Sequence, residues 1–175
     1  SVEFESALAF DANESLSFGI EYLIGLWGRE LDGGGPTASY LTFWSDNLIQ
    51  EKLAFKQFLN LIDQRSKKNP GMRIYHFAPY ERVRIRAMAA RYKMDLGMVE
   101  KLMEHYFVDL YPVVRKGFAI GTPSYGLKAL ESLYMDPETR SGITGGDESV
   151  VAFRDYCIAI ENSDHNAAEK IRAAI

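Results

Sequence analysis

Apolar residues gather in three short segments over the first 45 residues. These segments cover residues 5–11, 18–28 and 38–45, and each has the length and the aliphatic or aromatic character of a strand. A turn-forming run rich in glycine separates the second segment from the third, at residues 32–36. Because short connections join antiparallel neighbours, this part of the chain predicts a three-stranded antiparallel meander.

The apolar spacing changes to a helical period after residue 45. Phe55, Phe58, Leu59 and Ile62 recur on one helical face, in a helix that follows an Asp46 or Asn47 cap and ends before residue 69. The later segments alternate in type. They are a strand over 72–77, helices over 79–93 and 96–105, an extended piece or helix start over 107–110, a helix over 125–134, and two closing helices over 149–160 and 164–175.

A meander followed by alternating strands and helices predicts a mixed α/β fold. We expect a sheet of about five strands, antiparallel first and parallel later, with helices on both faces. A doubly wound parallel sheet is the rival architecture, but it needs helices between its first strands, where this sequence has short connections.

The amino-acid composition is ordinary for a globular protein. The 175 residues are 47% hydrophobic and 25% charged, which is enough apolar material for the core of one domain. Cys157 is the one cysteine, so no intrachain disulfide forms, and a reducing, cytoplasmic location is expected. No segment has the apolar length of a membrane helix, and the first residues lack the pattern of a signal peptide.

Charge is unevenly distributed along the chain, whose formal net charge is −4. Residues 65–93 contain nine basic side chains and one acidic one, Glu81, whereas the last third is acidic. Such asymmetry is typical of a face that binds a polyanion, although a solvated helix face gives the same pattern.

Three acidic residues follow three of the expected elements: Asp11, Glu81 and Asp109. Carboxylates that converge at the end of a sheet can bind hard divalent cations, and such ions promote phosphodiester cleavage. Acidic residues at element ends also serve as helix caps, so their spacing alone leaves both roles open.

The sequences of four segments resemble one known family. They are residues 19–25 (GIEYLIG), 75–81 (YHFAPYE), 108–111 (VDLY) and 123–131 (PSYGLKALE). They are similar to motifs of the YprB-like domain, a ribonuclease-H-like fold of the DEDD 3′–5′ exonuclease superfamily that occurs in predicted RecB-family nucleases. The resemblance spans roughly residues 7–175. It implies a Mg²⁺- or Mn²⁺-dependent exonuclease domain that acts on the 3′ end of DNA or RNA.

The chain departs from this family at two places. The first motif, Asp-x-Glu in the family, reads Asp11-Ala12-Asn13 here, with Glu14 one position late. The final motif carries an Asp in a helix after residue 175. We therefore expect a single domain excised from a larger nuclease or helicase, with weak metal binding and little or no activity by itself.

The resemblance and the charge pattern together assign candidate roles. Catalytic candidates are Asp11, Glu81 and Asp109, and metal ligands are Asp11, Asn13, Glu14 and Glu81. Nucleic-acid contacts are expected from Arg73, Arg82, Arg86 and Lys128, with His76 and Tyr80 supporting the site. Two alternatives remain: a degenerate module that only binds nucleic acid, and a scaffold that binds none. The choice of DNA or RNA and the oligomeric state stay open.

Overall fold

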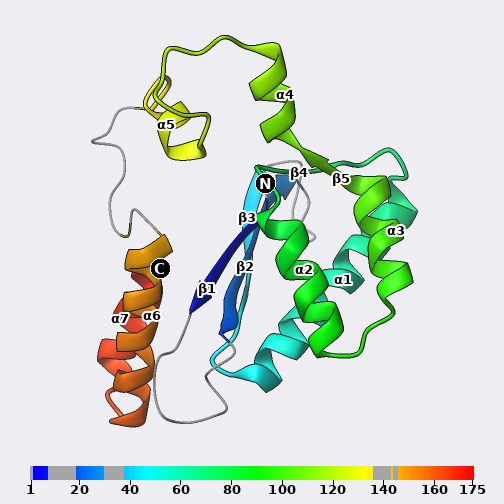
Figure 1. The fold of residues 1–175 in the computed structure, drawn as a ribbon. Coiled ribbons are helices and arrows are strands. Elements are labelled where there is room, and N and C mark those ends of the chain that lie inside the picture. Colours follow the sequence, from blue (N-terminus) through cyan, green and yellow to red (C-terminus); the bar gives the residue numbers. More distant parts are fainter. Residues whose placement is uncertain (1, 8–18, 30–37, 136–142, 144–145) are drawn as a thin grey trace.

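A computed structural model of the chain describes residues 2–7, 19–29, 38–135, 143 and 146–175. Strands and helices alternate after an opening group of three strands (Figure 1). In chain order the elements are β1 (Val2–Ala7), β2 (Ile20–Arg29), β3 (Ala38–Trp44), α1 (Leu48–Lys68), β4 (Ile74–His76), α2 (Tyr80–Arg91), α3 (Leu96–Tyr106), β5 (Phe107–Asp109), α4 (Leu110–Gly117), α5 (Leu127–Glu131), α6 (Gly146–Glu161) and α7 (His165–Ala174).

The first three strands form the predicted antiparallel meander, with β2 in the centre. β1 starts earlier than predicted, because its backbone pairs with β2 from Val2, which lies opposite Leu26. Helix α1 then begins as predicted. The side chain of Asn47 accepts hydrogen bonds of 3.0 Å from the backbone N–H groups of Ile49 and Gln50, which would otherwise be unpaired at the helix start.

A β-bulge divides β2 into two parts. Leu23 lies opposite Glu5 and Glu21 lies opposite Ser6, so Tyr22 is an extra residue on β2. Alternation of side chains therefore changes phase at this point. Tyr22 and Leu23 both contribute to the layer beneath α6 and α7, whereas Ile24 lies in the opposite layer. The bulge thus determines which residues of β2 face each of the two layers.

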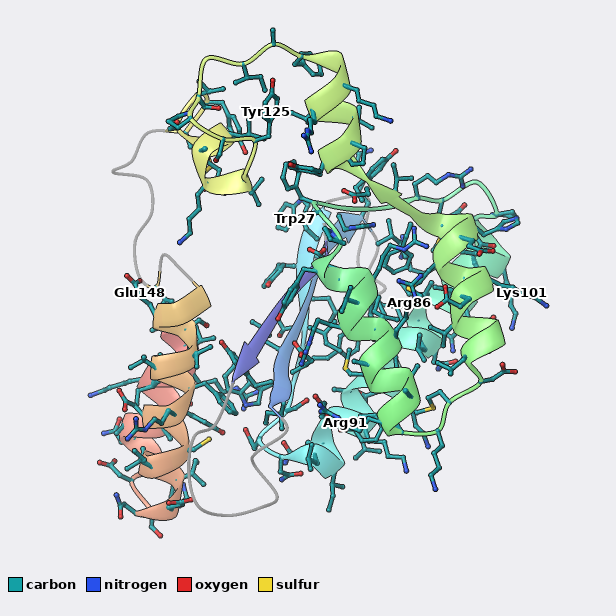
Figure 2. The ribbon with its side chains drawn as sticks, in the orientation of Figure 1. Trp27, Arg86, Arg91, Lys101, Tyr125 and Glu148 are labelled. Atoms are coloured by element: carbon teal, nitrogen blue, oxygen red, sulfur yellow. The ribbon has the colours of Figure 1, made fainter. Side chains whose placement is uncertain are left out.

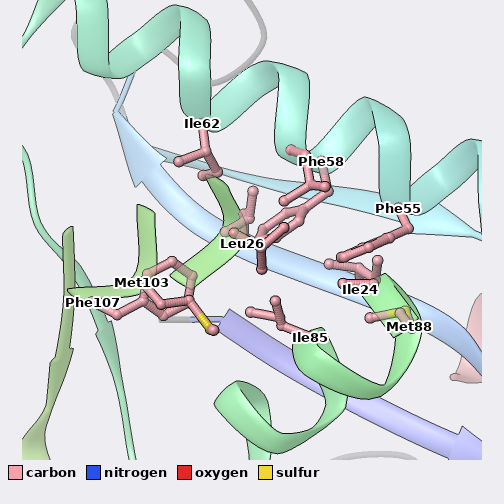
Figure 3. Packing of buried hydrophobic residues seen from close by; sticks show 12 residues of the cluster. Ile24, Leu26, Phe55, Phe58, Ile62, Ile85, Met88, Met103 and Phe107 are labelled. Carbon is pink, nitrogen blue, oxygen red and sulfur yellow. The ribbon is translucent and has the colours of Figure 1, made fainter. Parts of the chain in front are cut away.

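The larger core lies between the meander and helices α1–α3 (Figure 3). Ile24 and Leu26 of β2 meet the apolar stripe of α1, which is the stripe predicted from the sequence. Helices α2 and α3 close this core with Ile85, Met88, Ala89, Val99 and Met103. The periodic apolar residues of the sequence therefore become one continuous buried cluster.

The second core lies on the other face of the meander, under α6 and α7. Aromatic rings dominate it: Tyr22 stacks on Phe153 with ring centroids 4.2 Å apart, and Trp44 meets Phe153 edge-on. The Arg172 guanidinium of α7 lies 5.0 Å from the Trp44 ring centroid. Helices thus cover both faces of the meander, which gives the expected mixed α/β layering (Figure 1).

β4 and β5 form a separate two-stranded parallel ladder. β4 lies next to β1, so the spatial order runs from β3 through β2 and β1 to β4 and β5. Within the described residues no ladder joins β1 to β4. The described strands therefore form a three-stranded antiparallel sheet and a two-stranded parallel sheet, and they do not form the single sheet of about five strands that the sequence predicted.

Two helices differ from the prediction. Residues 110–117 form α4, where the sequence indicated only an extended piece or a helix start. Pro112 lies in the first turn of α4, where proline is tolerated because its missing N–H has no helical partner. α5 is shorter than the predicted 125–134 and covers Leu127–Glu131. No helix among the described residues is long and apolar enough to cross a membrane.

Candidate functional site

The parallel pairing of β4 with β5 brings two candidate site residues together. His76, the last residue of β4, lies directly opposite Asp109, the last residue of β5. Both strands end there, so the loops that follow them leave from the same edge. Ligand sites in open α/β sheets commonly form at such edges.

The turn after β4 is built around Ala78. This residue has a φ of 70°, a left-handed conformation that is strained for a residue with a Cβ. Its backbone N–H donates to Asp109 Oδ1 at 2.9 Å, and its carbonyl oxygen accepts from His76 Nδ1 at 2.8 Å. Two candidate side chains therefore hold the strained turn in place.

Asp109 makes a second contact with the same oxygen. Oδ1 also accepts from the Tyr111 N–H at 2.9 Å, so Asp109 is the N-cap of α4. Its carboxylate thereby fixes both the turn that leads into α2 and the start of α4. This arrangement supplies a structural role for a residue that the sequence offered as a catalytic candidate.

Glu81 lies in the first turn of α2 and is 9% exposed. Its Oε2 atom lies 3.5 Å from His76 Nδ1, a distance at which the attraction is electrostatic rather than a well-formed hydrogen bond. Within the described part of the chain, neither Glu81 Oε2 nor His76 Nε2 has a hydrogen-bond partner. Tyr80, at the start of α2, is exposed next to this pair.

The surroundings of His76 shift its protonation equilibrium. Burial by itself lowers the pKa of His76, but Glu81, the Ala78 carbonyl and Asp109 together raise this pKa above its ordinary value. Hydrogen bonding to Ala78 orients the ring and directs Nε2 away from that bond. The site therefore combines one buried carboxylate with an imidazole whose cationic form is favoured.

These residues fit a hard divalent cation in part. Glu81 offers a buried carboxylate oxygen without a hydrogen-bond partner among the described residues, and hard cations prefer such oxygen ligands. The described ranges contain no group of three or more side chains that could hold a metal. The other predicted ligands, Asp11, Asn13 and Glu14, lie outside the described residues.

Comparison with known families agrees with this geometry. A model of the RNase H superfamily matches residues 13–173, which is nearly the whole chain. This chain belongs to the RNase H superfamily. The ribonuclease-H-like relationship expected from the sequence motifs is thereby confirmed, whereas the DEDD exonuclease and YprB-like assignments stay proposals. No curated protein and no solved structure gives a significant match to the chain.

Three of the four arginines of α2 in this RNase H superfamily domain, Arg84, Arg86 and Arg91, pair with acidic residues (Figure 2 labels Arg86 and Arg91). Arg86 donates two hydrogen bonds to Glu100 of α3, at 2.5 and 2.8 Å, and lowers the pKa of Glu100. Arg82 lies near the same carboxylate and contributes to this shift. Arg73 and Lys128 are exposed, and Arg73 also donates to the Met72 carbonyl at 2.7 Å.

Sequence reasoning missed a buried ionic network between β2, α1 and α2. Glu21 of β2 and Glu51 of α1 are fully buried, and they pair with Arg84 and Arg91 of α2 respectively. Glu51 Oε1 also accepts from the Glu21 backbone N–H at 2.5 Å. Glu21 lies inside an otherwise apolar strand segment, and that signal was available in the sequence because buried carboxylates require partners.

Proposed function

We propose that this chain is a metal-dependent nuclease domain of the 3′–5′ exonuclease type, with weak or no activity by itself. Its place in the RNase H superfamily supports a nuclease-like role on nucleic acid. The observation that carries the proposal is the convergence of His76, Glu81 and Asp109 at the shared ends of β4 and β5. A YprB-like domain within a larger RecB-family nuclease or helicase is the finer form of this proposal.

Glu81 would bind Mg²⁺ or Mn²⁺ through Oε2, which has no hydrogen-bond partner among the described residues, together with Asp11 and with Asn13 or Glu14. Such an ion supplies electrostatic stabilisation for charge that develops on a phosphodiester. Asp109 holds the turn and the start of α4, and its Oδ1 atom is already engaged by two backbone N–H groups. His76 restrains the same turn beside Glu81. Arg73, Arg82, Arg86 and Lys128 would contact the phosphate backbone.

A degenerate module that binds nucleic acid without cleaving it is the second candidate. One feature of the sequence and one of the structure favour it. Asn13, a neutral ligand, stands where the resembled family has Glu, and the Asp109 carboxylate is committed to capping. Fewer anionic ligands weaken the attraction for Mg²⁺, which releases its hydration water reluctantly.

Metal titration of matched variants tests the proposal. We expect Mn²⁺ to bind weakly to the wild-type chain, and Glu81→Gln to lower that affinity roughly ten-fold or more because a charge-bearing ligand is lost. Glu104→Gln replaces an exposed carboxylate of α3 by a carboxamide and serves as the control. This variant should bind Mn²⁺ with the affinity of the wild type. Equal Mn²⁺ affinity in the Glu81 variant and the wild type would refute the metal site.

A cleavage assay tests for residual activity, which only the first candidate can have. With Mn²⁺ and a 5′-labelled single-stranded oligonucleotide, an active exonuclease shortens the strand from its 3′ end. A degenerate module binds the oligonucleotide but leaves its length unchanged.

A further inference from the structure

One segment of the molecule stands apart from both cores. Residues 110–135, which we call the α4–α5 arm, leave the body where β5 ends and project beyond the sheet (Figure 1). Leu130 is the one buried residue in this segment, which the structure describes throughout. The arm therefore presents nearly all of its side chains to the surroundings.

The arm differs in charge from the rest of the chain. It contains three basic residues, Arg115, Lys116 and Lys128, and one acidic residue, Glu131, so its net charge is +2 in a chain of net charge −4. All three basic side chains are exposed. In the described part of the chain none of the three forms an ion pair, in contrast to Arg84, Arg86 and Arg91 of α2.

Exposed aromatic rings accompany these cations. Phe118, two residues after Lys116, is 62% exposed, and Tyr134 is 68% exposed. The loop between α4 and α5 is held in shape, since Tyr125 Oη donates to the Phe118 carbonyl at 3.1 Å (Figure 2 labels Tyr125). Thr122 Oγ1 likewise donates to the Ser124 carbonyl at 2.8 Å. The two helices that carry the cations are thus joined by a loop that internal hydrogen bonds hold in shape.

We infer that the α4–α5 arm binds a single-stranded nucleic acid and guides it toward the candidate site. Cationic side chains interleaved with exposed aromatic rings bind single strands through phosphate contacts and base stacking. The arm follows directly after Asp109, whose carboxylate also holds the turn before Glu81. A nucleic-acid strand bound along the arm would therefore lead to the carboxylate of Glu81. This inference rests on the proposed function, because it takes the polyanion to be the substrate.

Equilibrium binding in the presence of EDTA tests the arm independently of any metal-dependent chemistry. Fluorescence anisotropy with a labelled 12-nucleotide oligo(dT) or oligo(U) gives the affinity at several salt concentrations. The pair Arg115→Ala and Lys116→Ala should weaken binding about ten-fold and reduce the slope of log affinity against log salt by about 1.4, since each lost phosphate contact on a single strand removes about 0.7. The control pair is Arg154→Ala and Lys170→Ala, whose side chains are exposed on α6 and α7. It should leave the affinity and the salt slope within two-fold of the wild-type values.

Phe118→Ala tests the stacking contribution separately. It should weaken binding about five-fold or more while leaving the salt slope unchanged, because stacking releases no counterions. Far-UV circular dichroism checks that each variant is folded, and exposure of these side chains makes folding defects unexpected.

The outcomes distinguish this inference from the proposed function. If the wild type binds oligonucleotides and the Arg115/Lys116 and Phe118 variants bind equally well, the arm inference is overturned while the nucleic-acid function stands. If the wild type binds no oligonucleotide, both are overturned. Binding to vesicles of anionic lipid in place of oligonucleotides would show the arm to be a membrane-surface element and would also overturn the inference.

Discussion

Glu21 shows how a single buried residue couples the fold to pH. Burial raises the pKa of Glu21 to about 7, and Arg84 opposes this shift without cancelling it. In the unfolded chain the same carboxyl ionises at its ordinary pKa of about 4.5. Between these two values the folded state holds more protons than the unfolded state, so the free energy of unfolding decreases as pH rises.

We therefore predict that Glu21→Gln flattens the pH dependence of stability. The wild-type contribution of Glu21 is complete below pH 4.5 and is lost as pH rises to about 7, a change of roughly 3 kcal/mol for a shift of this size. Glutamine carries no titratable proton and keeps the shape of the side chain. Urea titrations from pH 4 to 8 measure the difference, with Glu169→Gln on the exposed face of α7 as the control. An unchanged slope in the Glu21 variant would contradict a raised pKa.

At the level of single residues, part of the candidate site could be predicted from the sequence. The 75–81 motif drew attention to His76 and Glu81, and β-strand pairing then brought Asp109 beside them. The sequence could not show that Asp109 caps α4, because the cap depends on where β5 ends in space. It also could not show that Arg86 pairs with Glu100, since that contact requires the packing of α2 against α3.

Asp109 is the point where separate elements meet. Through Oδ1 it connects the end of β5, the turn that leads into α2 and the first turn of α4. Removal of this oxygen leaves two backbone N–H groups without their acceptor. The arm and the carboxylate of Glu81 are therefore held by one shared side chain.

We predict different results for two substitutions at Asp109. Asp109→Ala should lower the free energy of unfolding by about 1–2 kcal/mol, because the cap and the turn contact are both lost. Asp109→Asn keeps an oxygen acceptor and should be nearly as stable as the wild type. Chemical denaturation measures both, and Mn²⁺ titration completes the comparison. A loss of metal affinity in Asp109→Asn as large as that in Glu81→Gln would instead identify Asp109 as a ligand.

Elements with strong local signals were predicted well. The meander and α1 follow from apolar periodicity, a polar cap at Asn47 and glycine-rich or proline-containing ends, all of which act over a few residues. The helix α4 was not predicted, because its eight residues include Pro112 and Gly117 and none of them is buried. Its formation depends on the Asp109 cap, which the fold supplies.

The two cores of the whole molecule share a strand. β2 contributes Ile24 and Leu26 to the layer under α1–α3, and Tyr22 and Leu23 to the layer under α6 and α7. Loss of either layer therefore exposes apolar surface of the strand that the other layer needs. This arrangement favours cooperative unfolding as a single domain.

We predict that fluorescence and far-UV circular dichroism report one coincident unfolding transition. Trp44 reports on the aromatic core, since it contacts Phe153 and Tyr156, whereas circular dichroism reports on all helices. Phe153→Leu should lower the free energy of unfolding by about 1–3 kcal/mol and shift the midpoint of both probes equally. Two separated transitions would show that the cores unfold independently.

The bulge in β2 also determines where this strand can vary in length. If Tyr22 were deleted, the pairs Glu5–Leu23 and Ser6–Glu21 would become consecutive, so regular alternation would return and every other residue of β2 would keep its face. Loss of Gly25, in the regular part of the strand, would instead turn Leu26 away from its core and the exposed Trp27 toward it. In related sequences, loss of a residue should therefore be commoner at position 22 than at the regular positions of this strand.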